Sequence, residues 1–519
     1  MPDDRKCVWI FPVSAKRWLW GDLALRVEQE TGLRPILVVS SQADAAFYLG
    51  QMAGKLSADQ IVVAPEIYSI GMQTADAEEA EKILREAKAL ENRFGMTFMR
   101  EFVQADRHFG RGFMWGWNQI PESFAGRSAS VPGTLRACIK MIRFFDDLAE
   151  THAPGLVIAH GGGTGIAGKP VSLLCREKGV PFRSLAASRF GSLYYWAEDE
   201  FENASSFVRA MENEAMPDPA DLDGVDEVLS PPAAFKAVAR GKRKAETLLG
   251  ACKISAAQLV YRLYWRWTGK AKGLVGYTPV SAALAPFVRW SHARRVRKAP
   301  FVTIADLPQD RKIVMVPLQF EPEASLNGQS PEASLILQVI YETALSLPAD
   351  AVLVVKEHPL QLGRRPVWFY RIVSRMPNTV LLQADEPGSA LIKKASLVAQ
   401  INSSVGYEAA VRGVPVASFG HHGPIKCMQH VRVIAGKQDL DWIRTAIYDA
   451  ENPDIVLQRC REGLRYLRVT QRVCMDLADI NKPGRVDRPT ESELSLLVGK
   501  LLESLEPNDS SNRLAQVAR

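Results

Sequence analysis

The feature that most constrains the fold of this chain is a strand–helix alternation that occurs in two separate runs. Strand-like runs of the first part are residues 7–12, 35–40, 60–64, 155–160 and 181–185. The alternation stops after residue 200 and resumes with strand-like runs at 312–317, 351–355, 379–382, 397–400 and 414–419. Strands that alternate with helices form parallel sheets with right-handed crossovers. The sequence therefore predicts an α/β protein with two Rossmann-type domains.

Four segments follow from this pattern in the 519 residues. We expect an N-terminal Rossmann-like domain over residues 1–200 and a helical, basic insertion or linker over 201–310. A C-terminal Rossmann-like domain is expected over 311–485, and a C-terminal helix with a flexible tail over 486–519.

Cysteine usage and hydropathy indicate a cytoplasmic protein. The seven cysteines are scattered and form no CxxC pair, which is typical of a reducing compartment and gives no metal motif or disulfide framework. The polar start of the chain lacks the apolar stretch of a signal peptide. No window has the apolar length of a transmembrane helix. We expect a cytoplasmic location, where the protein could also attach peripherally to the inner membrane.

The net charge of +6 is concentrated in one segment. Residues 236–298 contain fifteen Lys and Arg residues and one acidic residue, Glu246, so this segment carries +14 and the rest of the chain −8. Tyr and Trp residues alternate with these charges. Nucleic acid, an anionic membrane or a polyanionic glycan could bind such a segment, and a solvated helical insertion that packs on a neighbouring domain is an equal alternative. Among the functional interpretations we favour the anionic inner-membrane surface over nucleic acid.

Polar motifs follow three strands of the second run. Lys356-Glu357-His358-Pro359 follows one strand, and Asn402-Ser403-Ser404 follows another and begins a helix. Ligands of open α/β sheets bind at this carboxyl edge, and a histidine, hydroxyl groups and a helix N-terminus suit a phosphate and a ribose. A structural histidine and a simple helix N-cap are the alternatives.

A third motif, Glu321-Pro322-Glu323, follows the strand at 312–317. Carboxylates at this edge could serve as nucleophile, base or oxocarbenium stabiliser in glycosyl transfer. A solvated acidic loop is the alternative.

Together, these motifs resemble the capsule polysaccharide biosynthesis family, which includes bacterial Kdo transferases. The resemblance rests on 318–325, 355–359, 402–409, 413–416 and 419–420. It is firm over 311–442 and weaker over 155–200. The His-Pro and Ser-Ser pieces are also similar to those of bacterial sialyltransferases, which likewise use CMP-activated acidic sugars.

The resemblance implies a GT-B fold, with two Rossmann-type domains facing across a cleft, a CMP-sugar donor and retaining transfer through a carboxylate nucleophile. It implies no metal and no cofactor besides the donor. It places catalysis on Glu323, Glu321 and His358, and donor binding on His358, Pro359, Lys356, Asn402, Ser403, Ser404, Gly406 and Glu408. The family's acidic motif is typically Gln-x-Asp, which this chain replaces with Glu321-Pro322-Glu323.

Candidates on the acceptor side lie in the first domain. A Gly-rich turn over residues 160–165 follows a strand and could cradle a phosphate, although a plain tight turn fits equally well. The other candidates are Asp106, Arg107, His108, Arg111 and Arg189, for which local salt bridges or exposed loops are the alternatives.

The sequence thus predicts a glycosyltransferase that moves Kdo or a similar ulosonic acid from a CMP-sugar to a lipid-linked or glycan acceptor. One alternative is a UDP-sugar-using GT-B transferase or epimerase. The other is a non-catalytic component of capsule assembly or export, and capsule assembly proteins are possible partners in either case.

Overall fold

The computed structural model describes residues 6–13, 16–106, 109, 129–159, 165–224, 247–267, 279–321, 323–359, 361–362, 364–421 and 423–506. The chain forms two compact units. The first unit comprises Met1–Val103, Ser130–Glu214 and Arg468–Arg519, and the second comprises Gln104–Ala129 and Ala215–Leu467. This division differs from the predicted boundaries, because the C-terminal segment returns to the first unit and most of the basic segment joins the second.

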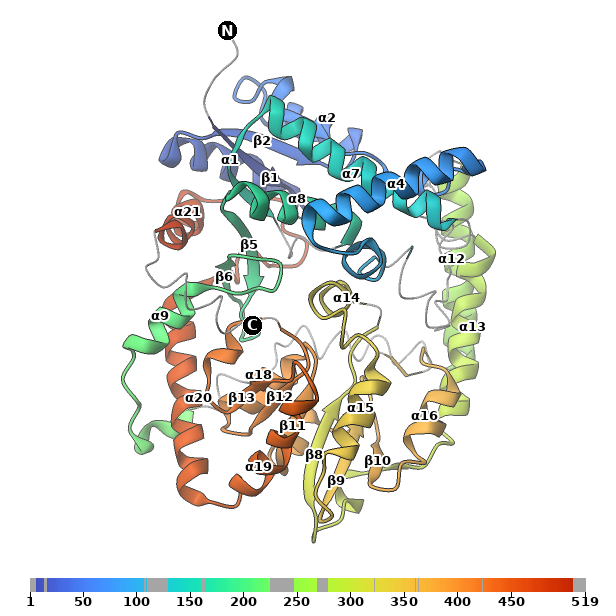
Figure 1. Ribbon diagram of the computed structural model, residues 1–519, viewed down its shortest axis with the longest axis vertical. Helices are drawn as coiled ribbons and strands as arrows, with labels where there is room; N and C mark the ends of the chain where they lie inside the picture. The colour runs from blue at the N-terminus through green and yellow to red at the C-terminus, as the bar shows by residue number, and fades with distance from the viewer. Residues whose placement is uncertain are drawn as a thin grey trace. The chain divides into compact units, whose positions relative to one another are not determined.

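The first unit contains a seven-stranded sheet with the order β14-β6-β5-β4-β1-β2-β3 (Figure 1). Its strands are β1 (Cys7–Phe11), β2 (Arg34–Val39), β3 (Ile61–Val63), β4 (Pro154–Ala159), β5 (Phe182–Ala187), β6 (Leu193–Ala197) and β14 (Met475–Asp476). β1 to β5 are parallel, whereas β6 and β14 pair antiparallel to their neighbours. β1 to β6 follow the 3-2-1-4-5-6 order of a Rossmann fold.

Helices cover both faces of this sheet because its central strand is apolar on both sides. Val8 and Ile10 of β1 belong to a core cluster with residues of α1, whereas Trp9 stacks on Phe145 of α7 with the ring centroids 6.1 Å apart. The helices of this unit are α1 (Arg17–Thr31), α2 (Gln42–Gln51), α3 (Ile67–Gly71), α4 (Ala77–Phe94), α7 (Val131–Thr151), α8 (Gly165–Lys178), α9 (Ser205–Asn213) and α21 (Glu491–Leu505), with the short turns η2 (Ala58–Gln60) and η3 (Met99–Val103).

The C-terminal helix α21 is part of the first core. Leu494, Leu497 and Leu501 lie in the same cluster as β1, and the indole nitrogen of Trp196 donates to the Leu497 carbonyl at 2.9 Å. The helix predicted after residue 486 is therefore present and packed. The predicted tail after residue 506 lies outside the described residues.

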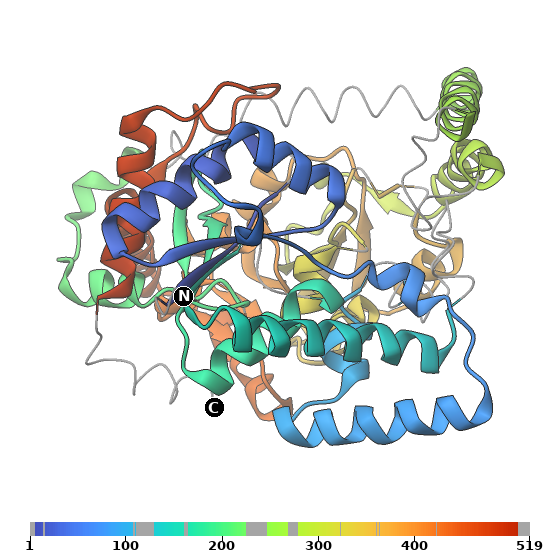
Figure 2. The same ribbon diagram turned by 90° about the horizontal axis from the view of Figure 1, so that it is seen from above.

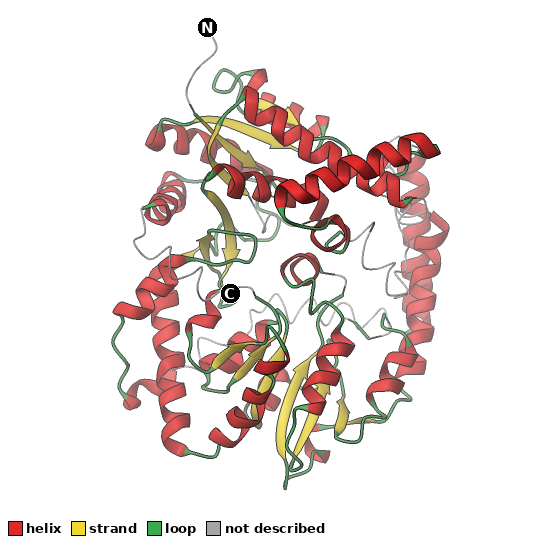
Figure 3. Ribbon diagram, in the orientation of Figure 1, coloured by secondary structure: helices red, strands yellow, loops and turns green. Residues whose placement is uncertain are grey.

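The second unit contains another seven-stranded sheet, with the order β13-β12-β11-β8-β9-β10-β7. Figure 3 draws the strands of both units in yellow and the helices in red. All its described pairings are parallel. Its strands are β7 (Phe301–Val302), β8 (Lys312–Pro317), β9 (Ala351–Lys356), β10 (Thr379–Leu382), β11 (Ala395–Gln400), β12 (Val416–Ser418) and β13 (Val431–Val433). β8 to β13 repeat the Rossmann order, and β7 is added beside β10.

The helices of the second unit flank this sheet. They are α14 (Ala324–Gln329), α15 (Ile336–Leu345), α16 (Val367–Val373), α17 (Gly388–Ile392), α18 (Ser404–Val411), α19 (Asp441–Asp449) and α20 (Pro453–Val473), whose last residues belong to the first unit. The short turns are η4 (Pro219–Gly224), η6 (Ile304–Asp306), η7 (Pro424–Cys427) and η8 (Lys437–Asp439). The predicted α/β class with two Rossmann-type domains is thus confirmed. The face-to-face arrangement across a cleft stays a prediction.

The described part of the basic segment is helical, as predicted. It forms α12 (Leu248–Trp267) and α13 (Pro279–Val296), which lie side by side (Figures 1 and 2). The Ser255 hydroxyl of α12 donates to the Ala283 carbonyl of α13 at 2.5 Å, and Val296 enters the second core. None of the described helices has both the length and the apolar character needed to cross a membrane.

Candidate functional site

Three loops that carry most of the predicted site residues meet at the carboxyl edge of the second sheet. They follow β8, β9 and β11, and β8 lies between the other two strands. The chain order reverses between β8 and β11, which makes this the switch point where open α/β sheets bind ligands. The Leu318 N–H donates to the Lys356 carbonyl at 2.8 Å, and the Gln361 amide donates to the Glu321 carbonyl at 2.8 Å.

Gln319 links the β8 loop to the β11 loop. With its side-chain oxygen turned toward the available donors, it accepts from the backbone N–H of Asn402 at 2.6 Å and of Ser403 at 3.2 Å. Gln319 is buried, so these bonds form away from water. The structure therefore brings Glu321, Asn402 and Ser403 onto one connected edge, as the order of the motifs predicted.

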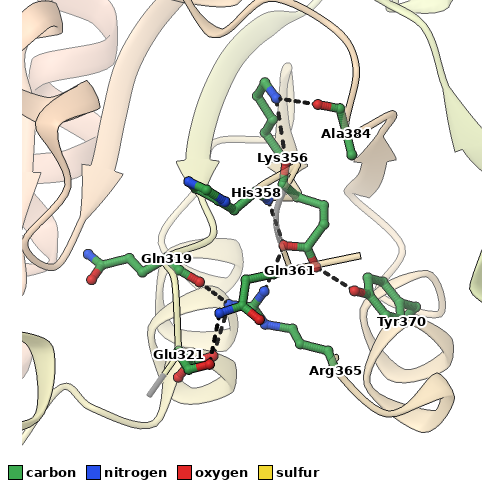
Figure 4. Close-up of polar contacts among 9 residues, drawn as sticks. Gln319, Glu321, Lys356, His358, Gln361, Arg365, Tyr370 and Ala384 are labelled. Carbon is green, nitrogen blue, oxygen red and sulfur yellow. Dashed lines mark hydrogen bonds and ion pairs between the residues drawn. The ribbon is translucent and has the colours of Figure 1, made fainter. Parts of the chain in front are cut away.

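A buried ionic cluster lies beneath this edge (Figure 4). The Arg365 guanidinium, 1% exposed, donates to Glu357 Oε1 at 2.6 Å and to Glu321 Oε2 at 2.9 Å. It also donates to the Gln319 backbone carbonyl, and the Tyr370 hydroxyl donates to the other oxygen of Glu357. One planar cation thus joins the loops after β8 and β9 through hydrogen bonds with fixed directions.

Burial and charge act together on the cluster. Burial alone lowers the pKa of Arg365, but Glu357 and Glu321 hold it above its ordinary value. Burial raises the pKa of Tyr370 well above its ordinary value, and Glu357 raises it further. Both groups therefore keep their protons and stay hydrogen-bond donors at neutral pH.

His358 stands at the edge of this cluster. Its backbone N–H donates to Glu357 Oε1 at 2.6 Å, so the cluster fixes the residue through its main chain. Its half-buried imidazole makes an edge-to-face contact with Phe320 of the β8 loop, with the ring centroids 6.0 Å apart. Pro359 follows it and is also half-buried. A held but partly exposed imidazole suits a group that donates to a phosphate oxygen.

Lys356, which was predicted to bind the nucleotide-sugar donor, has a buried position. The side chain is buried, and its amino group donates to the Ala384 carbonyl at 3.2 Å and to the Glu357 carbonyl at 3.4 Å (Figure 4). Burial lowers the pKa of Lys356, and the charge of Glu357 opposes that effect. In this structure the ammonium therefore binds backbone carbonyls between β9 and the loop after β10.

The N-terminus of α18 lies at the same edge. Ser403 is its N-cap and accepts from the Val405 N–H at 3.2 Å, and Ser404 is the exposed first residue of the helix. The Asn402 side chain accepts from the Ser330 hydroxyl at 3.1 Å. A capped helix N-terminus with adjacent hydroxyls combines backbone donors with the positive end of the helix dipole.

Two further predicted residues lie deeper in α18. Gly406 is buried, and a Cβ at this position would approach the Gln400 side chain to 2.8 Å. Glu408 forms an ion pair with Arg412 at 2.9 Å. The structure thus gives Gly406 a role in packing the helix on β11, and it gives Glu408 a partner on its own helix.

The two predicted carboxylates differ in their surroundings. Glu321 is 8% exposed at its side chain and is paired with Arg365, whereas Glu323 is half-buried at the N-cap position of α14. The Glu323 carbonyl accepts from the Asn327 N–H at 2.9 Å, and no side-chain capping bond forms at this position. Pro322 lies outside the described residues.

The residues predicted to bind the acceptor are either outside the described residues or held in local contacts. Residues 160–164, Arg107, His108 and Arg111 lie outside the described residues. Asp106 is buried in a local turn, where it accepts from the Phe109 N–H at 3.0 Å. Arg189 pairs with Glu202 at 2.9 Å, which is the local salt bridge named as its alternative.

Gln319, Arg365 and Tyr370 were not among the site residues predicted from the sequence. Gln319-Phe320-Glu321 has the Gln-x-acid spacing of the family motif, so this signal was present two residues before the position that we assigned. Arg365 and Tyr370 gave no signal, because their roles depend on a tertiary contact. Within the described parts of the chain, no group of three or more His, Cys, Asp or Glu side chains is placed to hold a metal ion.

Comparison with known proteins supports the resemblance to a family. Residues 285–422 match the family described as capsule polysaccharide biosynthesis protein, which confirms the predicted resemblance for this segment. A search of curated proteins finds no match.

Two solved structures are among those similar to this chain. One is the UDP-GlcNAc 2-epimerase from Neisseria meningitidis, with 11% identity, coverage of 90% of this chain and 99% of that chain, and a TM-score of 0.25. The other is the Thermosulfurimonas dismutans KpsC beta Kdo 2,7 transferase, with 16% identity, coverage of 58% and 79%, and a TM-score of 0.26. At these TM-scores neither likeness assigns a substrate to this chain.

Proposed function

With residues 285–422 matched to the capsule polysaccharide biosynthesis family, we propose that this protein is a glycosyltransferase of capsule or surface polysaccharide biosynthesis. The observation that carries the proposal is the convergence of three polar loops at the switch point of the second sheet. That edge offers His358, the capped N-terminus of α18 and two carboxylates within one hydrogen-bonded framework.

We propose a CMP-activated ulosonic acid, such as Kdo, as the donor. Ser403, Ser404 and the N-terminus of α18 bind its phosphate, and His358 donates a hydrogen bond to the phosphate oxygen as the sugar leaves. The support is geometric: the Glu357–Arg365 cluster holds the main chain of His358, and the residue stays partly exposed. A single phosphate between a sugar and a nucleoside needs one anion site, which one helix N-terminus supplies.

We propose that Glu323 is the nucleophile and that Glu321 positions it. Glu321 shares its charge with Arg365 and is largely buried, so it is a poor nucleophile in this structure. Glu323 lies two residues further along the same loop and is half-buried at the N-cap position of α14, so it is more accessible than Glu321. A carboxylate nucleophile forms a glycosyl-enzyme ester, and water or the acceptor hydroxyl then releases the sugar with net retention.

We propose a lipid-linked glycan acceptor, which places the enzyme at the cytoplasmic face of the inner membrane. An acceptor anchored in lipid requires the enzyme to work at the bilayer surface, where we propose that it attaches peripherally.

A thermal-shift panel of the full-length protein with CMP, CDP, UDP, UMP, GDP and ADP tests the proposal. A ligand that binds only the folded state at 100 times its Kd adds about 2.7 kcal/mol to the free energy of unfolding. We expect CMP to give the largest rise in Tm and His358→Ala to remove most of that rise. His152→Ala, which changes a half-buried histidine of the first unit, serves as the control and keeps the CMP response.

The panel also separates the alternatives. If UDP gives the largest rise in Tm, the donor is a UDP-sugar and not a CMP-sugar. If none of the nucleotides raises the Tm, the glycosyltransferase proposal is contradicted. With a donor in hand, Glu323→Gln is expected to lower transfer by at least about 100-fold while CMP still binds. If Glu321→Gln abolishes transfer and Glu323→Gln does not, the roles of the two carboxylates are reversed.

A further inference from the structure

The α12–α13 hairpin carries an exposed apolar stripe that the fold of the second unit does not cover. Leu249, Val260 and Trp267 of α12 are 67%, 67% and 86% exposed, and Leu263 between them is 51% exposed. Residues spaced by three, four and eleven positions lie on the same face of an α-helix. These four side chains therefore form one line along α12, opposite the buried Ala251 and the Ser255 that bonds to α13.

The two helices also carry exposed basic residues. Lys253 is exposed on α12, and Arg294, Arg295 and Lys298 are exposed at the end of α13 and just after it. Residues 247–267 and 279–298 contain no Asp or Glu. An exposed apolar line on helices that have no acidic residue of their own is unusual for a solvated surface, whose charges normally include both signs.

We infer that the α12–α13 hairpin docks flat on an anionic phospholipid bilayer, with the stripe Leu249, Val260, Leu263 and Trp267 inserted at headgroup depth. From Leu249 to Trp267 the stripe runs about 27 Å along the helix, at 1.5 Å per residue, which suits a helix that lies in the plane of the interface. Trp267 has the amphipathic ring that favours the interface, and the Lys and Arg residues match the negative surface potential of the leaflet.

The hairpin also has a firm attachment to the catalytic unit. Ala293 and Val296 of α13 lie in the second core with β8 and β9, and α13 contacts α16, which carries Tyr370 of the ionic cluster. Docking would therefore hold the β8–β9 edge at a fixed distance from the lipid. The inference names the partner surface of the proposed enzyme, and to that extent it rests on the proposed function.

Vesicle flotation of the full-length protein tests the inference. We expect binding to vesicles of equal parts phosphatidylglycerol and phosphatidylcholine at low ionic strength, weakening as salt rises, and little binding to phosphatidylcholine alone. The double variant Leu249→Ser/Val260→Ser is expected to weaken binding at least about tenfold. Its matched control is Leu345→Ser/Val486→Ser, which removes the same groups from sites that are 68% and 77% exposed.

A second pair of variants isolates the charge. Arg294→Gln/Arg295→Gln is expected to weaken binding by about 25-fold, at about fivefold for each basic side chain near the surface, and to reduce the salt dependence. Lys393→Gln/Lys394→Gln, an adjacent exposed pair elsewhere in the second unit, is the control and should keep wild-type binding.

Three results would overturn the inference: no binding of the wild-type protein to anionic vesicles, equal losses in the hairpin and control variants, or equal binding to neutral vesicles. The first would point to a protein as the partner of this stripe. Vesicle binding needs no nucleotide, so a protein that binds vesicles but no nucleotide contradicts only the proposed function. A protein that binds CMP but no vesicles contradicts only the docking.

Discussion

The two units share one strand order but place their buried charges in different parts of the fold. In the first unit, Lys169 of α8 is 3% exposed, bonds to Glu200 at 3.0 Å and pairs with Glu101 of η3. In the second unit, Arg365 joins Glu321 and Glu357 beneath the carboxyl edge of the sheet. Both clusters bear the desolvation cost of buried charge.

The difference lies in what each cluster holds in place. The Lys169 cluster joins a helix to a short π-helical turn and to the turn after β6, so it connects elements of the scaffold. The Arg365 cluster joins the two loops that carry Glu321 and His358. The shared strand order gives each sheet a carboxyl edge. In the second sheet, a buried ionic cluster also joins two loops of that edge, and such support is what a functional site requires.

The largest effects are expected from removal of the two buried cations, Arg365 and Lys169. These variants also test most directly whether the two clusters have different roles. Arg365→Met leaves the buried carboxylates of Glu321 and Glu357 without their cation, which costs about 3 kcal/mol or more of unfolding free energy. Lys169→Met is expected to cost less, because Glu200 keeps its ion pair with Arg176 at 3.0 Å. We expect Arg365→Met also to weaken CMP binding at least tenfold, since the loops lose their common anchor, whereas Lys169→Met leaves the Kd of CMP unchanged. Urea denaturation measures the first quantity, and calorimetry on the folded variants measures the second.

Arg365→Lys serves as the conservative control, because it keeps the charge but cannot donate to both carboxylates in the same planar geometry. Partial recovery of CMP affinity in Arg365→Lys supports a positioning role. If Lys169→Met weakens CMP binding as much as Arg365→Met does, the distinction between the two clusters is lost.

The sequence predicted the sheets well because buried parallel strands carry a local signal. The apolar run 351–355 matches β9, whose residues are all buried, and the run 312–317 matches β8. The carboxyl-edge motifs were predicted for the same reason: a polar residue directly after such a run lies at the edge of the sheet. Gly406, by contrast, was assigned to ligand binding from its place in a motif, although its close approach to Gln400 is a packing requirement.

The rest of the site depends on contacts between residues far apart in the chain. Arg365 bonds to the Gln319 carbonyl 46 positions earlier, and nothing in the run Arg364-Arg365 shows which of the two is buried. The return of α21 to the first unit is also non-local, because its apolar stripe fits any sheet face of suitable shape. Sequence periodicity identifies a buried face but does not identify its partner.

Removing one tyrosine hydroxyl from each unit is expected to have an intermediate effect. The Tyr370 hydroxyl donates to the buried carboxylate of Glu357, whereas the Tyr195 hydroxyl of the first unit donates to the Glu202 carbonyl at 2.8 Å. Hydrogen bonds to charged groups contribute more than those to neutral ones, so we expect Tyr370→Phe to cost about 2 kcal/mol and Tyr195→Phe about 1 kcal/mol. Urea denaturation of both variants measures the difference, and equal costs would show that Glu357 is satisfied without Tyr370.

The smallest expected effect concerns an ion pair of the first unit. Arg485 donates to Glu493 at the start of α21 and holds the pKa of Glu493 at about 2, below its ordinary value of 4.5. A depressed carboxyl pKa stabilises the fold fully above pH 4.5, and that contribution is lost as pH falls toward 2. Solvent screening limits it to about 1 kcal/mol. The difference in unfolding free energy between wild type and Glu493→Gln should therefore shrink over that pH range, whereas Glu503→Gln, from the exposed pair with Lys500 on the same helix, should change little. A constant difference across the range would show that Glu493 acts through its capping bonds to Thr490 and not through its charge.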